Sequence, residues 1–243
     1  MKHDSTVGII GAMDIEIARL TAALDEVREE IVAGLLFYVG KLKQRPVIVV
    51  KSGIGKVNAA RCTQLLIDHY HVHYIVNTGI AGGLDPTLSI GDIVIADGLV
   101  QHDFDLSAFG YARGYLATGI NKDRPTIFHP DETVSRLLEE SAAELISADK
   151  IKTGCIATGD QFISDPAKKE TIKATFSAMA VEMESCAIAQ VASQNGIPFA
   201  IIRAISDLAD GTASQSYEVF EAEAAELSAA ILKHLLTKLD DDQ

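Results

Sequence analysis

Short apolar runs rich in valine and isoleucine alternate along the whole chain with segments whose apolar residues recur every three or four positions. Strands at 35–42 and 46–52 are separated by a turn-like KQR and are expected to form a hairpin. The other predicted strands are 7–13, 73–83, 92–100, 152–160, 178–184 and 199–207. The predicted helices are 14–27, 56–71, 185–196 and 216–239. Strands that alternate with helices predict an α/β fold with a largely buried, mixed or parallel sheet.

The composition is that of a globular protein with one sizeable core. Of the 243 residues, 48% are hydrophobic and 23% are charged, which argues against disorder. No internal repeat, low-complexity linker or composition break divides the chain. One domain is therefore expected over residues 1–243, with residues 240–243 as a frayed tail.

The formal net charge of −13 argues against partners that themselves carry many negative charges. Nucleic acids and anionic membranes bind basic surfaces, so neither is an expected partner. The three cysteines, Cys62, Cys155 and Cys186, include no CxxC pair and favour reduced thiols in the cytoplasm. No run approaches 18 apolar residues, and the apolar stretch near the N-terminus is too short for a signal peptide, so no membrane span is expected.

Polar residues follow the predicted strands, and ligands of open α/β sheets bind beyond the carboxyl ends of the strands. Four strands run into GAMDIE, NTGIAGG, VEMES and AISDLAD. Glu16, Glu184 and Asp207 therefore become candidates for one cleft that is built from distant parts of the chain. Gly79 and Gly82 would let backbone amides approach a ligand closely.

Three motifs that suggest a cofactor or a metal lack what such sites require. GIIGAM has no GxGxxG, so NAD is not expected. SGIGKV differs from a P-loop because Val50 stands at the first glycine position and Val57 at the metal-binding Ser/Thr position. His69, His71 and His73 straddle a predicted helix end and the next strand, so they cannot share one face of a regular element. Neither a cofactor nor a metal is expected.

Carboxylates in one cleft without histidine ligands suggest acid/base chemistry on a glycosidic bond. In that chemistry one carboxyl group protonates or hydrogen-bonds the leaving group and another orients water. Glu182, beside Glu184, is interpreted as structural, with Arg203 as its candidate partner. A calcium site and ordinary surface acids are the alternatives that the pattern leaves open.

Eight segments occur in order from about Val7 to the C-terminal helix: GIIGAMDIEI, KSGIGKVNAA, NTGIAGG, GDIVIAD, HDFDLSAFGY, TGDQFI, AVEMES and RAISDLAD. Together they resemble the bacterial 5′-methylthioadenosine/S-adenosylhomocysteine nucleosidases of the nucleoside phosphorylase superfamily. The resemblance implies a single domain with a twisted, mixed β-sheet flanked by helices. It also implies cofactor-free hydrolysis of the N-glycosidic bond of these two nucleosides, in methionine salvage and the activated methyl cycle.

The resemblance implies a role for each acid of the expected cleft. Glu16 would activate and orient the hydrolytic water, while Glu184 and the backbone of Met183 would bind the ribose hydroxyls. Asp207 would be the acid at adenine N7. An unperturbed aspartate has a pKa of about 3.9 and is ionised at neutral pH, so Asp207 would have to be protonated through burial and hydrogen bonding to N7.

The rest of the substrate is expected to meet mostly apolar residues. The residues implied for adenine are Ala81, Gly82, Phe162 and Ile163, with Phe162 stacked on the base. Those implied around the ribose and the 5′-alkylthio group are Met13, Ile54, Tyr217 and Phe220. The resemblance further implies a homodimer in which Leu106 and Phe109 enter the pocket of the partner subunit.

Three departures and three rival functions accompany this resemblance. Asp14 and Ile15 replace a more acidic run before Glu16, which is itself kept. Ile80 stands where relatives commonly carry a hydroxyl, and Tyr217 where a phenylalanine is common. A phosphorylase would need arginines for a phosphate dianion, but Arg61 and Arg203 are interpreted as embedded in a helix and a strand. A hydrolase of another purine nucleoside such as futalosine shares much of the constellation, and a non-catalytic nucleoside-binding protein would lack one of the acids.

Overall fold

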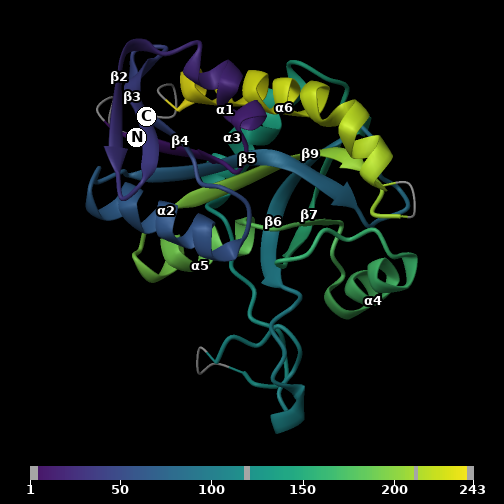
Figure 1. Ribbon diagram of the computed structural model, residues 1–243. Helices are drawn as coiled ribbons and strands as arrows, with labels where there is room; N and C mark the ends of the chain where they lie inside the picture. The colour runs from purple at the N-terminus through teal and green to yellow at the C-terminus, as the bar shows by residue number, and fades with distance from the viewer. Residues whose placement is uncertain (1–4, 118–120, 211–212, 240–243) are drawn as a thin grey trace.

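The computed structural model describes residues 5–117, 121–210 and 213–239, and at its centre is a nine-stranded sheet (Figure 1). The strand order is β2-β3-β4-β1-β5-β8-β7-β6-β9, with an additional pairing of β5 and β9. Parallel and antiparallel pairs both occur, so the predicted α/β fold with a mixed sheet is confirmed. The strands are β1 Val7–Gly11, β2 Asp25–Val32, β3 Leu35–Leu42, β4 Arg45–Lys51, β5 Tyr74–Gly83, β6 Ile93–Gln101, β7 Ile151–Thr158, β8 Ala180–Glu182 and β9 Phe199–Asp207.

The pairing of β5 with β9 closes one half of the sheet into a ring of β5, β8, β7, β6 and β9. β5 and β9 run parallel, from Ile75 opposite Phe199 to Gly82 opposite Asp207. β8 is antiparallel to β5, with Val181 opposite Gly82. The ring thus brings the carboxyl ends of β5 and β9 beside β8, where three of the polar motifs lie.

Helices cover both faces of the sheet, as Figure 1 shows. On one face, Leu20 of α1, Leu138 of α3 and Leu235 of α6 are fully buried in one apolar cluster. On the other face, Leu66 of α2 and Ile188 of α5 are fully buried in a second cluster. The helices are α1 Asp14–Thr21, α2 Lys56–Asp68, α3 Glu132–Ala143, α4 Pro166–Phe176, α5 Ser185–Gln194 and α6 Ala213–Lys238, with short 3₁₀ turns η1 Ser107–Phe109 and η2 Ala148–Lys150. Among the described residues, no helix has the length and apolar character needed to cross a membrane.

Two helices were not among those predicted, although each begins with a recognisable cap. The Asp131 side chain accepts a hydrogen bond from the Val134 N–H (2.9 Å) at the start of α3. The Asp165 side chain accepts one from the Ala167 N–H (2.8 Å) at the start of α4, which has Pro166 in its first turn. These caps are the sequence signals that would have found both helices.

The helix predicted over residues 14–27 is wrong in its second half. The helix ends at Thr21, and β2 begins at Asp25 as an edge strand antiparallel to β3. Five of the eight β2 residues are charged and most are exposed, so this segment has no apolar stripe to bury as a helix. The predicted hairpin is confirmed, and β3 turns into β4 through Lys43 and Gln44, both with positive φ.

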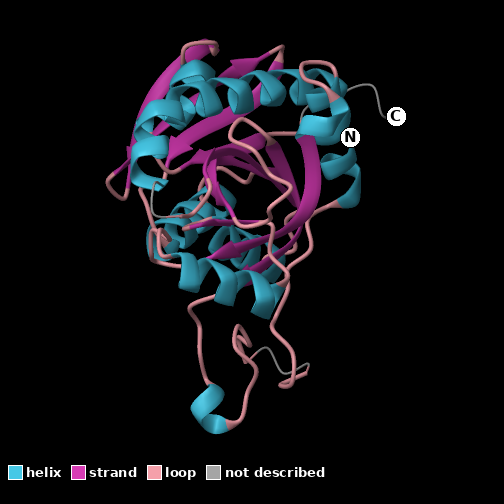
Figure 2. Cartoon of the chain, turned by 90° about the vertical axis from the view of Figure 1, so that its right-hand side faces the viewer, coloured by secondary structure: helices cyan, strands magenta, loops and turns pink. Residues whose placement is uncertain are grey.

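Between β6 and α3 the chain leaves the body of the protein as a long arm (Figures 1 and 2). The arm carries η1 at its far end, and the Phe109 side chain there is 77% exposed. Loops of this length inside a compact domain are uncommon and usually functional. An exposed phenylalanine at the end of such an arm indicates a surface that meets something other than its own chain.

Candidate active site

A pocket lies where the chain leaves β1, β5, β8 and β9, beside the start of α6. Its walls contain every residue predicted for the site except Ile163, Phe220, Leu106 and Phe109. The lining residues are Ala12, Met13, Glu16, Ile54, Ile80, Ala81, Gly82, Phe162, Val181, Glu182, Met183, Glu184, Ser206, Asp207 and Tyr217. Acids from three separate segments therefore face one largely apolar space.

Glu16 is in the first turn of α1 and is only 4% exposed. Its Oε2 accepts hydrogen bonds from the N–H groups of Ala12 (2.6 Å) and Met13 (3.0 Å), and its Oε1 accepts one from the Ile80 N–H (3.1 Å). Burial raises the pKa of Glu16, while the Arg203 charge and the three N–H donors oppose that rise. Backbone N–H groups just after β1 and in β5 thus fix the orientation of this carboxyl group at the edge of the pocket.

Glu184 lies between β8 and α5 and is buried. The Gly55 N–H, from a distant loop, donates a hydrogen bond of 2.7 Å to its Oε1. Burial and then the neighbouring charge of Glu182 raise the pKa of Glu184 to about 8. A carboxyl group with so high a pKa exchanges its proton near physiological pH, as groups in functional sites often do.

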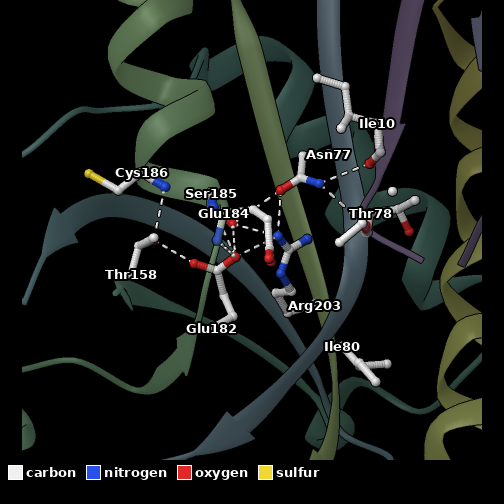
Figure 3. Close-up of polar contacts among 12 residues, drawn as sticks. Ile10, Asn77, Thr78, Ile80, Thr158, Glu182, Glu184, Ser185, Cys186 and Arg203 are labelled. Carbon is white, nitrogen blue, oxygen red and sulfur yellow. Dashed lines mark hydrogen bonds and ion pairs between the residues drawn. The ribbon is translucent and has the colours of Figure 1, made fainter. Parts of the chain in front are cut away.

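Glu182, which also lines the pocket, is by contrast the ion-pair partner of Arg203 (Figure 3). Its Oε2 accepts hydrogen bonds from Arg203 (2.8 Å) and from the Ser185 hydroxyl (2.9 Å), and the Thr158 hydroxyl donates to its Oε1. Asn77 accepts a further bond from Arg203. Burial would raise the pKa of Glu182, but the Arg203 charge and these donors outweigh it and lower the pKa. The predicted pairing of Glu182 with Arg203 is confirmed.

Replacing Arg203 with methionine is expected to destabilise the protein by about 3–5 kcal/mol, because Glu182 would remain buried without its cation. Urea unfolding at neutral pH measures this loss. Arg19→Met is the matched control, since Arg19 pairs with Glu226 at the surface, where side-chain exposures are 62% and 61%, and should cost less than about 1 kcal/mol. If Arg203→Met lowered the free energy of unfolding no more than Arg19→Met does, the structural role of the buried pair would be contradicted.

Asp207 is the last residue of β9 and is 2% exposed. Its Oδ1 accepts a hydrogen bond from the Ala209 N–H (2.8 Å), and the Ser206 hydroxyl lies 2.9 Å from its Oδ2. Burial raises the pKa of Asp207 above its usual value. Ser206 was not predicted, because adjacent strand residues normally point to opposite faces, yet it also lines the pocket.

Gly79 and Gly82 make room for acids of the site. A β-carbon at Gly79 would lie 2.5 Å from Glu16 Oε1, and one at Gly82 would lie 2.8 Å from Asp207 Oδ1. The sequence suggested that these glycines bring the backbone close to a ligand. Within the protein itself, their missing side chains let Glu16 and Asp207 approach β5.

The mouth of the pocket is apolar. Ile54 and Phe162 lie at it, 51% and 50% exposed. Phe162 meets Tyr217 edge to face, with ring centroids 5.8 Å apart, and the Tyr217 hydroxyl lies 3.0 Å from the Met13 sulfur. A flat apolar group could lie against Phe162 and a thioether against Met13 and Ile54.

Four predicted residues lie outside this lining. Ile163 is buried in a separate apolar cluster around α4, so its side chain does not face the pocket. Phe220 is partly buried one turn along α6 from Tyr217, and Leu106 and Phe109 belong to the arm. The lining residues that were not predicted as part of the site are Ala12, Ile80, Val181, Glu182 and Ser206. From the sequence, Ile80 is only a departure from the family pattern and Glu182 only a structural acid, while Ala12, Val181 and Ser206 give no signal for a site.

The chain is similar to known proteins over nearly its whole length. The sequence profile of the phosphorylase superfamily matches residues 6–237. A 5′-methylthioadenosine/S-adenosylhomocysteine nucleosidase of Marinomonas sp. (strain MWYL1) is 42% identical, over 96% of this chain and 98% of that protein. The structure of an S-adenosylhomocysteine nucleosidase from Streptococcus pyogenes in complex with 5-methylthiotubericidin has a TM-score of 0.91 at 38% identity, covering 98% of both chains. A futalosine hydrolase structure from Helicobacter pylori has a TM-score of 0.89 at 34% identity, covering 96% of this chain and 98% of that one.

Proposed function

Because the chain belongs to the 5′-methylthioadenosine/S-adenosylhomocysteine nucleosidases of the phosphorylase superfamily, which hydrolyse purine N-ribosyl bonds, we propose that these two nucleosides are its substrates. The products are adenine and the 5-thio-substituted ribose. The observation that carries this proposal is the set of three buried acids, Glu16, Glu184 and Asp207, around one apolar pocket.

Asp207 acts as the acid at adenine N7. As the glycosidic bond breaks, electrons flow into the base, and a proton on N7 makes adenine a better leaving group. Burial favours the protonated form of Asp207, as this role requires. The Ala209 N–H bonded to Oδ1 and the Ser206 hydroxyl beside Oδ2 support the role by fixing the carboxyl plane.

Glu16 orients the water that attacks the anomeric carbon. Its carboxyl group is held by N–H groups from Ala12, Met13 and Ile80, so its orientation toward a water is set before substrate enters. A carboxyl group with a raised pKa is also a better base than an ordinary glutamate, because its basicity is closer to neutral pH.

Glu184 binds the ribose hydroxyls, together with the backbone of Met183. The pKa of Glu184 is about 8 in the free protein, and the positive charge that develops on the ribose as adenine leaves favours its ionised form. The resulting carboxylate stabilises the transition state more than the ground state. Burial strengthens this attraction because the surroundings exclude water. The hydrogen bond from Gly55 keeps Glu184 in place.

The lining of the pocket favours water over phosphate as the nucleophile. Among the described residues that line it there is no lysine or arginine. Arg203, four residues before Asp207 on β9, is bonded to Glu182 and does not itself line the pocket. Ile80 adds an apolar side chain where a phosphate would require donors. The reaction is therefore hydrolysis.

The base and the 5′ group fit the apolar walls of the site. Phe162 stacks on adenine, and the backbone of Ala81, Gly82 and Ile163 meets its edge. Met13, Ile54, Tyr217 and Phe220 surround the ribose and the alkylthio group. The free cysteines and the carboxylate-based chemistry suit a cytoplasmic enzyme of methionine salvage and the activated methyl cycle.

A homodimer completes the site, with Leu106 and Phe109 of each arm in the pocket of the partner subunit. The projection of the arm away from its own body and the exposure of Phe109 support this arrangement (Figure 2). The exposed Ile54 and Phe162 at the mouth give the arm an apolar surface to meet.

Phe109→Ala is expected to raise KM for methylthioadenosine about tenfold, because the pocket loses an apolar wall contributed by the partner subunit. Steady-state kinetics and sedimentation measure the two consequences, a weaker pocket and a weaker dimer. Ile31→Ala on β2 is the control, since Ile31 is equally exposed at 77% but lies on the edge strand. An unchanged KM with an unchanged oligomeric state would contradict the shared site.

The substrate proposal is tested by measuring release of the purine base from methylthioadenosine, S-adenosylhomocysteine and futalosine in parallel. The purified protein is expected to act on both thio-nucleosides with kcat/KM at least tenfold above that for futalosine. A preference for futalosine would assign the site to that related reaction, and no release from any of the three would contradict a hydrolytic function.

A further inference from the structure

Three chain segments from distant parts of the sequence meet beside the pocket through one closed set of polar contacts. The Lys56 ammonium group lies 2.6 Å from Asp103 Oδ1. The other oxygen of Asp103 accepts a hydrogen bond from the Asp160 N–H (2.9 Å), and Asp160 Oδ1 accepts one from the Lys56 N–H (2.8 Å). Each of the three residues is thus bonded to both others.

The ion pair in this set is largely removed from solvent. The side chains of Lys56 and Asp103 are 18% and 16% exposed, whereas the pair between Lys41 and Glu26 on the sheet edge is 39% and 70% exposed. Lys56 also donates to Gln101 Oε1 (3.1 Å). Partly buried pairs with additional hydrogen bonds fix geometry better than surface pairs, which are screened and mobile.

Each of the three segments carries a group that the proposed function uses. Gly55, directly before Lys56, donates to Glu184. Asp160 precedes Phe162 by two residues, and Asp103 lies at the base of the arm that ends in Phe109. The fit is tight, because a β-carbon at Gly55 would lie 3.0 Å from Asp160 Oδ1.

We infer that Lys56, Asp103 and Asp160 are positioning residues that fix the base of the arm relative to the Gly55 N–H and Phe162. The contacts set the direction in which the arm leaves the body, and they hold the loop that orients Glu184. Lys56 and Asp103 therefore link two features of the proposed site: the contact that the arm makes with the partner subunit, and the orientation of Glu184 toward the ribose. This inference rests on the proposed function for its kinetic part only.

The test compares Lys56→Met and Asp103→Asn with a control, Lys41→Met. The control also removes a lysine ammonium group, but from the solvent-exposed pair between Lys41 and Glu26. Hydrogen–deuterium exchange is followed in the peptides that cover residues 52–58 and 101–117. Both peptides are expected to exchange faster in the first two variants and at the wild-type rate in the control. The reason is that Asp103 at the base of the arm loses its bond to Lys56, and Asp160, which accepts from the Lys56 N–H, is then held less firmly by Asp103. Unchanged exchange in both peptides would overturn the inference whatever the substrate is.

Kinetics then separates positioning from general stability. Asp103→Asn is expected to lower kcat/KM for methylthioadenosine about tenfold in the wild-type background. In the Phe109→Ala background the same substitution should lower kcat/KM less than about threefold, because the arm has already lost the Phe109 side chain that it places in the partner's pocket. Lys56→Arg, which keeps the charge, should recover most of the activity that Lys56→Met loses. Full additivity of Asp103→Asn with Phe109→Ala, or equal losses for methionine and arginine at position 56, would overturn the coupling. Wild-type protein inactive on every nucleoside would refute the proposed function, while the exchange data would still decide the positioning role.

Discussion

Asp207→Asn is expected to lower kcat by a factor of about 10²–10⁴ while nucleoside analogues still bind. An amide has nearly the shape of the carboxyl group but cannot deliver a proton to adenine N7. The contacts of Asp207 with Ala209 and Ser206 can largely persist in the variant, so the pocket should keep its form. Stopped-flow or steady-state assays of adenine release, together with the affinity for a non-hydrolysable analogue, measure the two effects separately.

Ser206→Ala is the matched comparison for Asp207→Asn. It removes the hydroxyl beside Asp207 Oδ2 but leaves the acid in place, so its effect should be a small fraction of that at Asp207. A near-normal kcat for Asp207→Asn would remove Asp207 from the acid role. A loss of analogue binding as large as the loss of kcat would instead indicate a role in holding the substrate.

Glu184→Gln is expected to lower kcat by about 10²–10³, because the ribosyl cation loses its negatively charged neighbour. The same substitution should raise thermal stability at pH 8 by a few degrees. The pKa of Glu184 is raised to about 8 in the folded protein from an ordinary value of 4.5, so the folded state holds a proton that the unfolded chain releases. Wild-type stability therefore falls as pH rises from about 4.5 to 8, and a neutral glutamine avoids this loss.

Thermal unfolding of wild type and Glu184→Gln at pH 5 and pH 8 checks the sign of this effect. The difference in Tm between the two proteins should be small at pH 5, where the wild-type carboxyl group is protonated, and larger at pH 8. If Glu184→Gln were less stable than the wild type at pH 8, the raised pKa of the buried Glu184 carboxyl group would be contradicted. An unchanged kcat for Glu184→Gln would indicate that Glu184 has only a structural role.

The sequence was sufficient for the α/β class and for most of the site because strand ends can be located from apolar runs. Glu16, Glu184 and Asp207 each lie at or just after the end of such a run. The parallel strands β1, β5 and β9 deliver Glu16 and Asp207 to one edge of the sheet, whereas Glu184 follows β8, which is antiparallel to β5. The sequence also assigned Glu182 a structural role and named Arg203, on the strand that leads to Asp207, as its candidate partner, and the ion pair in the structure confirms this pairing. The eight ordered motifs then supplied the family.

Other features depend on contacts that no local pattern records. Residues 25–27 continue a helical pattern, but pairing with β3 makes them part of a strand. The space that Gly79 provides for Glu16 and the approach of Gly55 to Glu184 both join residues more than 60 positions apart. The arm lacks a periodic pattern altogether, so its projection from the body came only from the structure (Figure 1).

In the proposed reaction, water and not phosphate receives the ribosyl group. The most direct measurement of this is the product formed from methylthioadenosine in phosphate-free buffer and again with excess phosphate, identified by phosphorus NMR and mass spectrometry. We expect the same rate of adenine release in both buffers and free methylthioribose as the product. Activity that requires phosphate, with a sugar 1-phosphate as the product, would contradict this expectation and would show that the apolar wall at Ile80 does not exclude the anion.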